Sequence, residues 1–235
     1  MRSGTALVAA AAVYFTAEFI AAAAWTNPPY SYTYHYISNL GVHGPSTGFG
    51  QDMYSPLAWV MNVGFFLFGP AVLIGVLRLR GLPAGRRRVL AATAALLAIG
   101  SVLVALFPGS GEAFDNGTAA YHGLGAFTAF GAGNVLAVLL GRSHRLLGVP
   151  RRLGRALVAS GILGFVSLAA FMGVLASQAD VLIGLFERGV IYPFLIGFMA
   201  LGAALTRQRS STGAVDAQSQ CGIGAQSGTS APRGE

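Results

Sequence analysis

The chain has 235 residues, of which 54% are hydrophobic and only 10% are charged, with a formal net charge of +7. Because ordinary soluble domains carry about 25% charged residues, this composition excludes a standard soluble enzyme, a nucleic-acid-binding domain and a disordered chain. The remaining class is a multi-pass membrane protein, and its partners are expected among membrane lipids rather than nucleic acids.

Six apolar runs are long enough to cross a hydrocarbon core, which takes about 20 helical residues and at least about 17. In chain order they are Thr5–Trp25, Pro56–Leu77, Val89–Phe107, Ala119–Leu140, Ala156–Ala176 and Val181–Leu205. The first is a retained helix or a signal peptide, and Glu18 inside it favours a retained helix. We predict an all-α fold: a single bundle of six transmembrane helices over residues 1–205, then a disordered cytoplasmic tail over 206–235.

The positions of the Arg residues predict how the chain is oriented. Cytoplasmic loops of membrane proteins are enriched in Lys and Arg, and two short segments between apolar runs hold most of the Arg residues here. The two clusters are Arg78, Arg80, Arg86, Arg87 and Arg88, and Arg142, Arg145, Arg151, Arg152 and Arg155. The pattern places both clusters and both termini on the cytoplasmic side of the cell membrane, where the Arg side chains contact anionic lipids.

Glu18 is the most informative of the polar residues, because it lies inside an apolar run. If Trp25 marks the outer interface, Glu18 lies seven residues deeper, about 10 Å below the surface. An ionised carboxylate at that depth has to face the bundle interior, be neutralised or be paired. Two interpretations stay open: a structural group held by an ion pair or hydrogen bond, and a functional proton donor, base or ligand contact.

Glu187 and Arg188 interrupt the last apolar run and offer Glu18 a partner. If that helix begins at Val181, Arg188 is also seven residues inside the outer boundary, at the level of Glu18. A Glu18–Arg188 pair is then the leading contact prediction. If the helix begins at Gly189 instead, about 17 residues still span the membrane and both charges move to the interface.

The first predicted outer segment, residues 26–55, combines prolines with alternating tyrosines. Pro28 and Pro29 prevent the preceding helix from continuing. Tyr30, Tyr32, Tyr34 and Tyr36 alternate, so an extended chain places their rings on one face. The segment is either an aromatic belt at the level of the lipid headgroups or a lid over a pocket in the bundle, and its length favours the lid.

No metal or cofactor is predicted. The potential ligands on the outer side, His35, His43, His122, Asp52, Glu112 and Asp115, lack a compact spacing, and the single cysteine, Cys221, lies in the tail. The sequence contains no nucleotide-binding or nucleophile-elbow motif. His122 enters a helix at the expected pocket rim, which makes it either a candidate base or a polar anchor at the interface.

Several of these residues carry a resemblance to a bacterial family, domain of unknown function 998. The stretch from Glu18 to Trp25, the tyrosine-rich segment after it, Phe107-Pro108, His122 and the stretch Glu187–Phe194 are similar to that family's landmarks over residues 5–205. Many relatives carry Asp where this chain has Asn39, so an acid role at that position is absent here. The resemblance implies a six-span membrane fold with short loops and brings no activity, substrate or cofactor.

We predict an intramembrane pocket facing the outer leaflet that binds a lipid, an isoprenoid, another amphiphile or a membrane partner. The candidate binding residues are Glu18, His35, Tyr34, Tyr36, Asn39, Glu187, Arg188 and Tyr192. The alternative is a membrane-embedded hydrolase, transferase or terpene-cyclase-like enzyme that uses Glu18 and His122 as acid and base. A proton-coupled transporter with Glu18 as carrier ranks last, because inverted repeats and matched broken helices are not evident.

Overall fold

The computed structural model describes residues 3–48, 50–179 and 181–226, and only the helical backbone from residue 209 onward. Six long helices are apolar enough to cross a membrane: α1 (Ser3–Ala24), α2 (Ala58–Leu77), α3 (Ala84–Leu106), α5 (Ala119–Arg142), α6 (Arg151–Ser177) and the first part of α7 (Ile183–Gln226). This confirms the predicted all-α, six-span fold.

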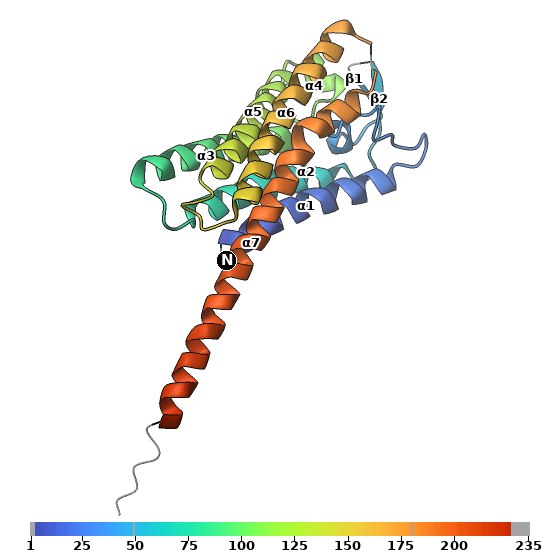
Figure 1. The fold of residues 1–235 in the computed structure, drawn as a ribbon. Helices are drawn as coiled ribbons and strands as arrows, with labels where there is room; N and C mark the ends of the chain where they lie inside the picture. Colours follow the sequence, from blue (N-terminus) through green and yellow to red (C-terminus); the bar gives the residue numbers. More distant parts are fainter. Residues whose placement is uncertain (1–2, 49, 180, 227–235) are drawn as a thin grey trace, which may run out of the picture.

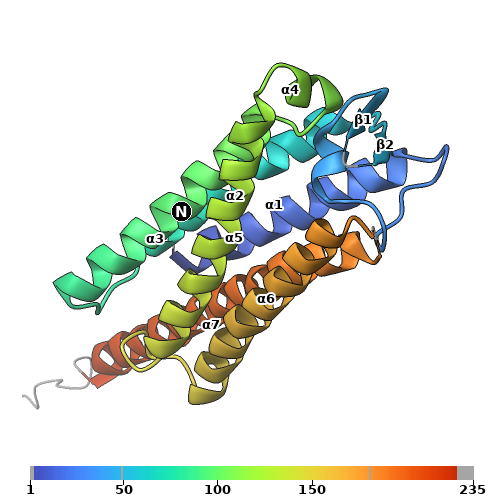
Figure 2. The same ribbon diagram turned by 90° about the horizontal axis from the view of Figure 1, so that it is seen from above.

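The six long helices pack together into one bundle (Figures 1 and 2). Each packs on the next in the chain, α7 closes the ring against α1, and α5 also touches α7. Within lipid there is no hydrophobic driving force for helices to associate, so close packing depends on small residues at the contacts. A Cβ atom on Gly100 of α3 would lie only 2.7 Å from the backbone oxygen of Gly125 on α5, which shows how closely the two backbones approach.

The two Arg-rich segments form short turns at the same end of the bundle. Gly81 and Gly148 take the left-handed conformation, with φ of +76° and +69°, which a residue with a side chain rarely adopts. Pro83 and Pro150 then precede α3 and α6. These helices begin five residues earlier than the predicted Val89 and Ala156, because Arg is a good helix former and needs no lipid contact there.

The other end of the bundle carries the loop between α1 and α2, which we call the α1–α2 loop (residues 25–57). It contains a 3₁₀ helix, η1 (Ser38–Gly41), and an antiparallel hairpin of β1 (Ser46–Gly48) and β2 (Gln51–Met53), in which Ser46 pairs with Met53. A short helix, α4 (Gly111–Asp115), packs beside β1. The loop is therefore folded onto the helix ends.

The prediction that the four tyrosines share one face is wrong. Residues 32–34 form turns instead of an extended chain. Tyr36 is buried, with 5% of its surface exposed, whereas Tyr34 is 54% exposed. The chain curls because backbone carbonyl groups of this segment converge on one guanidinium group, described below.

Helix α7 continues past Leu205 to Gln226 and projects beyond the bundle, as the long red helix in Figure 1. The disorder predicted for residues 206–235 stays a prediction, and residues 227–235 lie outside the described residues. An existing helix extends without the cost of a new nucleus. The start of α1 lies beside α7 at this same end, because Gly4 faces Gly202 and Thr206.

Candidate functional site

The predicted ion pair between Glu18 and Arg188 is present. The Nη2 and Nε atoms of Arg188 lie 3.0 and 3.1 Å from Oε1 of Glu18, and the two residues are 5% and 0% exposed. Helix α7 begins at Ile183, so Arg188 lies inside the helix rather than before it. Of the two predicted starts of this helix, Val181 and Gly189, the structure therefore supports the one near Val181.

The rest of the Arg188 guanidinium group binds the α1–α2 loop. Nη1 donates to the backbone oxygens of Tyr32, His35 and Gly184 at 2.8, 3.2 and 3.0 Å. Nη2 donates to the Tyr30 hydroxyl at 2.6 Å, and the Tyr32 ring centroid lies 4.7 Å from the guanidinium carbon. Arg188 thus uses charge, carbonyl oxygens and an aromatic face to connect the loop to α1 and α7.

The two carboxylate oxygens of Glu18 differ in their partners. Oε1 accepts hydrogen bonds from Arg188 and from the Tyr192 hydroxyl, the latter at 2.8 Å. Oε2 is buried and has no hydrogen-bond partner among the described residues. Burying a carboxylate oxygen without a hydrogen bond costs free energy. The ion pair therefore explains the burial of Oε1 but not that of Oε2.

Glu187 attaches the same loop at a second point. Its Oε2 accepts a hydrogen bond from the backbone N–H of Ile37, which immediately precedes η1. The first N–H groups of a helix lack partners within the helix and favour negative charge nearby. Glu187 and Arg188 therefore hold successive parts of the α1–α2 loop onto the start of α7.

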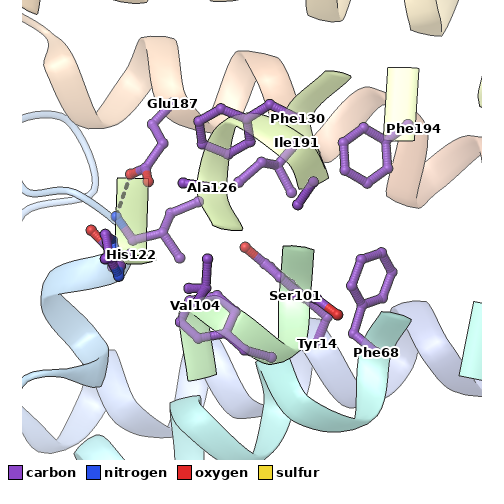
Figure 3. Close-up of a pocket in the computed structure, with 14 residues that line it drawn as sticks. Tyr14, Phe68, Ser101, Val104, His122, Ala126, Phe130, Glu187, Ile191 and Phe194 are labelled. Atoms are coloured by element: carbon purple, nitrogen blue, oxygen red, sulfur yellow. Dashed lines mark hydrogen bonds between the residues drawn. The ribbon is translucent and has the colours of Figure 1, made fainter. Parts of the chain in front are cut away.

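A cavity lies inside the ring of helices, directly below the point where Glu187 holds the loop (Figure 3). Its volume is about 50 Å³. Five helices and the loop contribute its lining: Tyr14, Ile37, Ser38, Phe65, Phe68, Ser101, Val104, His122, Ala126, Ala129, Phe130, Glu187, Ile191 and Phe194. The wall is mostly apolar, with Glu187 and His122 together on one side and Tyr14 and Ser101 on the other.

His122 and Tyr14 are two of the polar residues that line this cavity. Nδ1 of His122 lies 2.8 Å from the Phe107 carbonyl oxygen, and a carbonyl only accepts, so we assign the proton of the neutral ring to Nδ1. Nε2 is then a hydrogen-bond acceptor. The Tyr14 hydroxyl is buried and has no partner among the described residues, so the cavity contains a hydroxyl that an occupant can pair.

The structure divides the predicted site residues between different places. His122 and Glu187 line the cavity, whereas Glu18, Arg188 and Tyr192 form the ion-pair cluster beside it. The proposed acid and base, Glu18 and His122, are therefore not brought together around one space.

The remaining candidates stabilise the α1–α2 loop. His35 stacks on Trp25 at 5.4 Å, and burial together with the Arg188 charge lowers its pKa. Asn39 donates to Oε1 of Gln51, and Nε2 of Gln51 donates to the Tyr34 carbonyl, both at 2.7 Å. Tyr36 packs against Phe171, and Tyr34 is exposed. In the part of the chain that the structure describes, no group of three or more His, Cys, Asp or Glu residues is placed to hold a metal ion.

Residue-by-residue interpretation of the sequence missed Tyr14, Ser101 and Asn134. Tyr14 lies one turn before Glu18, and this i, i+4 spacing is the signal that places it on the same helix face. Asn134 is fully buried and donates to the backbone oxygens of Phe130 and Val190. Its signal is an amide inside an apolar run, which has to find partners in a neighbouring helix.

The comparison with family models identifies one family for this chain. A model described as "Protein of unknown function (DUF998)" matches residues 8–204. The chain therefore belongs to the DUF998 family, as the resemblance in its sequence predicted. No curated protein and no solved structure matches it.

Proposed function

We propose that this protein binds a membrane amphiphile, a lipid or an isoprenoid, and takes one narrow end of it into the cavity below the α1–α2 loop. The observation that carries the proposal is the lining of the cavity. Aromatic and aliphatic side chains from five helices surround it, and His122, Glu187 and the unpaired Tyr14 hydroxyl offer hydrogen bonds. Apolar walls with a few directed polar groups are typical of ligand sites.

The size of the cavity limits what enters it. Sites that enclose a whole ligand measure about 300–1,000 Å³, whereas this one measures about 50 Å³. That space holds a few water molecules or the end of a chain. The occupant is therefore slender, and the rest of the molecule lies outside the ring of helices.

The α1–α2 loop acts as a fixed cover in this proposal. Ile37 and Ser38 line the cavity, and the loop that carries them is tied to α7 through Glu187 and Arg188. The buried charges thus position the cover, while the cavity groups contact the occupant. We place the Arg-rich turns on the cytoplasmic side of the cell membrane, which puts the α1–α2 loop on the outer side.

One observation favours a second function, an enzyme acting on the same kind of amphiphile. The imidazole of His122 and the carboxyl group of Glu187 both line one cavity, and imidazole and carboxyl groups are the usual acid and base catalysts. In this alternative Glu187, rather than Glu18, works with His122.

Mass spectrometry of the lipids that co-purify with the full-length protein tests both functions. Ala126→Val adds two methyl groups at the cavity wall, and Ala92→Val adds the same groups to an exposed position of α3. We expect wild type and Ala92→Val to retain one enriched amphiphile and Ala126→Val to lose it while its thermal stability is maintained. A chemically altered amphiphile that disappears in His122→Gln indicates the enzyme, and the same bulk phospholipid in every sample contradicts both functions.

A further inference from the structure

A second concave site lies at the Arg-rich end, between the end of α5 and the start of α6. This groove has a volume of about 360 Å³ and is lined by Gly141, Arg142, His144, Arg151, Gly154, Arg155, Val158, Ala159 and Ile162. A Cβ atom on Gly141 would lie 2.5 Å from the backbone oxygen of Gly154. The two helix backbones therefore touch within the groove, and larger side chains line the rest.

One face of α6 runs along the groove and changes from charged to apolar. Arg151, Arg155, Val158 and Ile162 follow each other at intervals of four, three and four residues, which places them on a single helix face. The eleven steps from Arg151 to Ile162 rise about 16 Å along the helix axis. Ile162 is 56% exposed, so the apolar part of this stripe remains open to a partner.

The charged end of the groove has an excess of positive charge. Arg142, Arg151 and Arg155 are exposed, and the ion pair found among the described residues joins Arg188 to Glu18 at the opposite end of the bundle. The first turn of α6 adds to this charge, because Pro150 precedes it without a side-chain cap and the N–H groups there carry a partial positive charge.

We propose that this groove binds an anionic phospholipid. Arg142, Arg151 and Arg155 hold the phosphodiester group, since guanidinium groups match phosphate oxygens with paired hydrogen bonds. One acyl chain lies along Val158 and Ile162. The apolar half of the stripe selects a lipid over a free phosphate ion, because a soluble anion gains nothing from it. This site is separate from the cavity below the α1–α2 loop and does not depend on the function proposed for it.

The chain provides a matched control for this site. Arg87 and Arg88 at the start of α3 are also exposed and lie at the same end of the bundle. They carry the same general attraction for an anionic membrane surface, but they are not part of the groove. Replacing either pair removes two positive charges, so only a specific site distinguishes the two double variants.

The experiment is a lipid titration of the full-length, delipidated protein in neutral detergent, followed by native mass spectrometry. The probes are dioctanoyl-phosphatidylglycerol, dioctanoyl-phosphatidylcholine and inorganic phosphate. We expect saturable binding of the phosphatidylglycerol and weaker binding of the phosphatidylcholine. Arg151→Gln/Arg155→Gln raises the Kd for phosphatidylglycerol about tenfold or more, and Arg87→Gln/Arg88→Gln changes it less than about twofold. Ile162→Ser raises the Kd for phosphatidylglycerol about threefold, because contact with the acyl chain is lost.

Three results overturn the proposal. An equal loss of binding in both double variants shows general attraction to the Arg-rich end. Inorganic phosphate that binds as tightly as phosphatidylglycerol shows a free-anion site. Binding of phosphatidylglycerol that does not saturate shows the absence of a defined site. The thermal stability of each variant without lipid confirms that its fold is intact.

Discussion

The two ends of the bundle use arginine in opposite ways. At the end covered by the α1–α2 loop, Arg188 is buried and every donor group finds a carboxylate, a carbonyl or a hydroxyl. At the other end, Arg142, Arg151 and Arg155 are exposed beside an open groove. The buried arginine fixes one conformation of the protein, whereas the exposed ones remain available to a partner. The comparison predicts that replacing an arginine affects folding at one end and lipid binding at the other.

Arg188→Gln is expected to have the largest effect. The change leaves Glu18 buried with only the Tyr192 hydroxyl as a partner, and removing one member of a buried ion pair costs about 3–5 kcal/mol. Thermal unfolding in detergent measures the effect, with Arg87→Gln as the exposed control. A control that is destabilised as strongly as Arg188→Gln removes the distinction between the two ends.

Glu18→Gln is expected to be milder, at about 2 kcal/mol. Arg188 loses its countercharge but keeps the carbonyl oxygens of Tyr32, His35 and Gly184. The double variant Glu18→Gln/Arg188→Gln should be more stable than Arg188→Gln alone, because it has no unpaired carboxylate. A double-mutant cycle in which the two changes simply add contradicts this coupling.

Tyr30→Phe tests the hydrogen bonds that the Tyr30 hydroxyl makes within the α1–α2 loop and to Arg188. The Tyr30 hydroxyl accepts from Arg188 and donates to the Tyr36 carbonyl at 2.9 Å, so its loss should cost about 1 kcal/mol. Tyr34→Phe is the control, because Tyr34 lies in the same loop and is 54% exposed. Unfolding curves that do not differ between the two variants refute the role of Tyr30.

A small pH effect is expected at the loop end alone. The folded state lowers the pKa of His35, first through burial and then through the Arg188 charge, so folding disfavours the protonated ring. The contribution of His35 to the free energy of unfolding is fully present above the ordinary His pKa of about 6.5, and it decreases as the pH drops below that value. His35→Gln should reduce this fall in thermal stability between pH 7 and pH 5. A variant with an unchanged pH profile shows that the fall arises elsewhere.

The six spans were predictable from the sequence, and the ion pair was its leading contact prediction, which held only if the last helix began near Val181 and not at Gly189. Hydropathy marks the runs, and Glu18 and Arg188 lie equally far from their outer boundaries. The tyrosine segment was not predictable in this way. Its conformation depends on Arg188, which is more than 150 residues away in the chain and binds the carbonyls of Tyr32 and His35.

The cavity was also beyond the reach of the sequence pattern. Its polar atoms come from residues on separate helices, such as Tyr14, Ser101 and His122. Tyrosine and serine side chains are common in apolar runs, so nothing in the sequence shows which hydroxyl lacks a partner. Only the packing of the helices shows that the Tyr14 hydroxyl has no partner among the described residues.

An experimental structure of the protein purified with its native lipids tests the central proposal most directly. We expect elongated density in the cavity, with one polar end within hydrogen-bond distance of the Tyr14 hydroxyl, Glu187 or His122, and continuous density leading out of the ring. Isolated ordered water molecules in the cavity, with no density leading out, would contradict the binding of an amphiphile there.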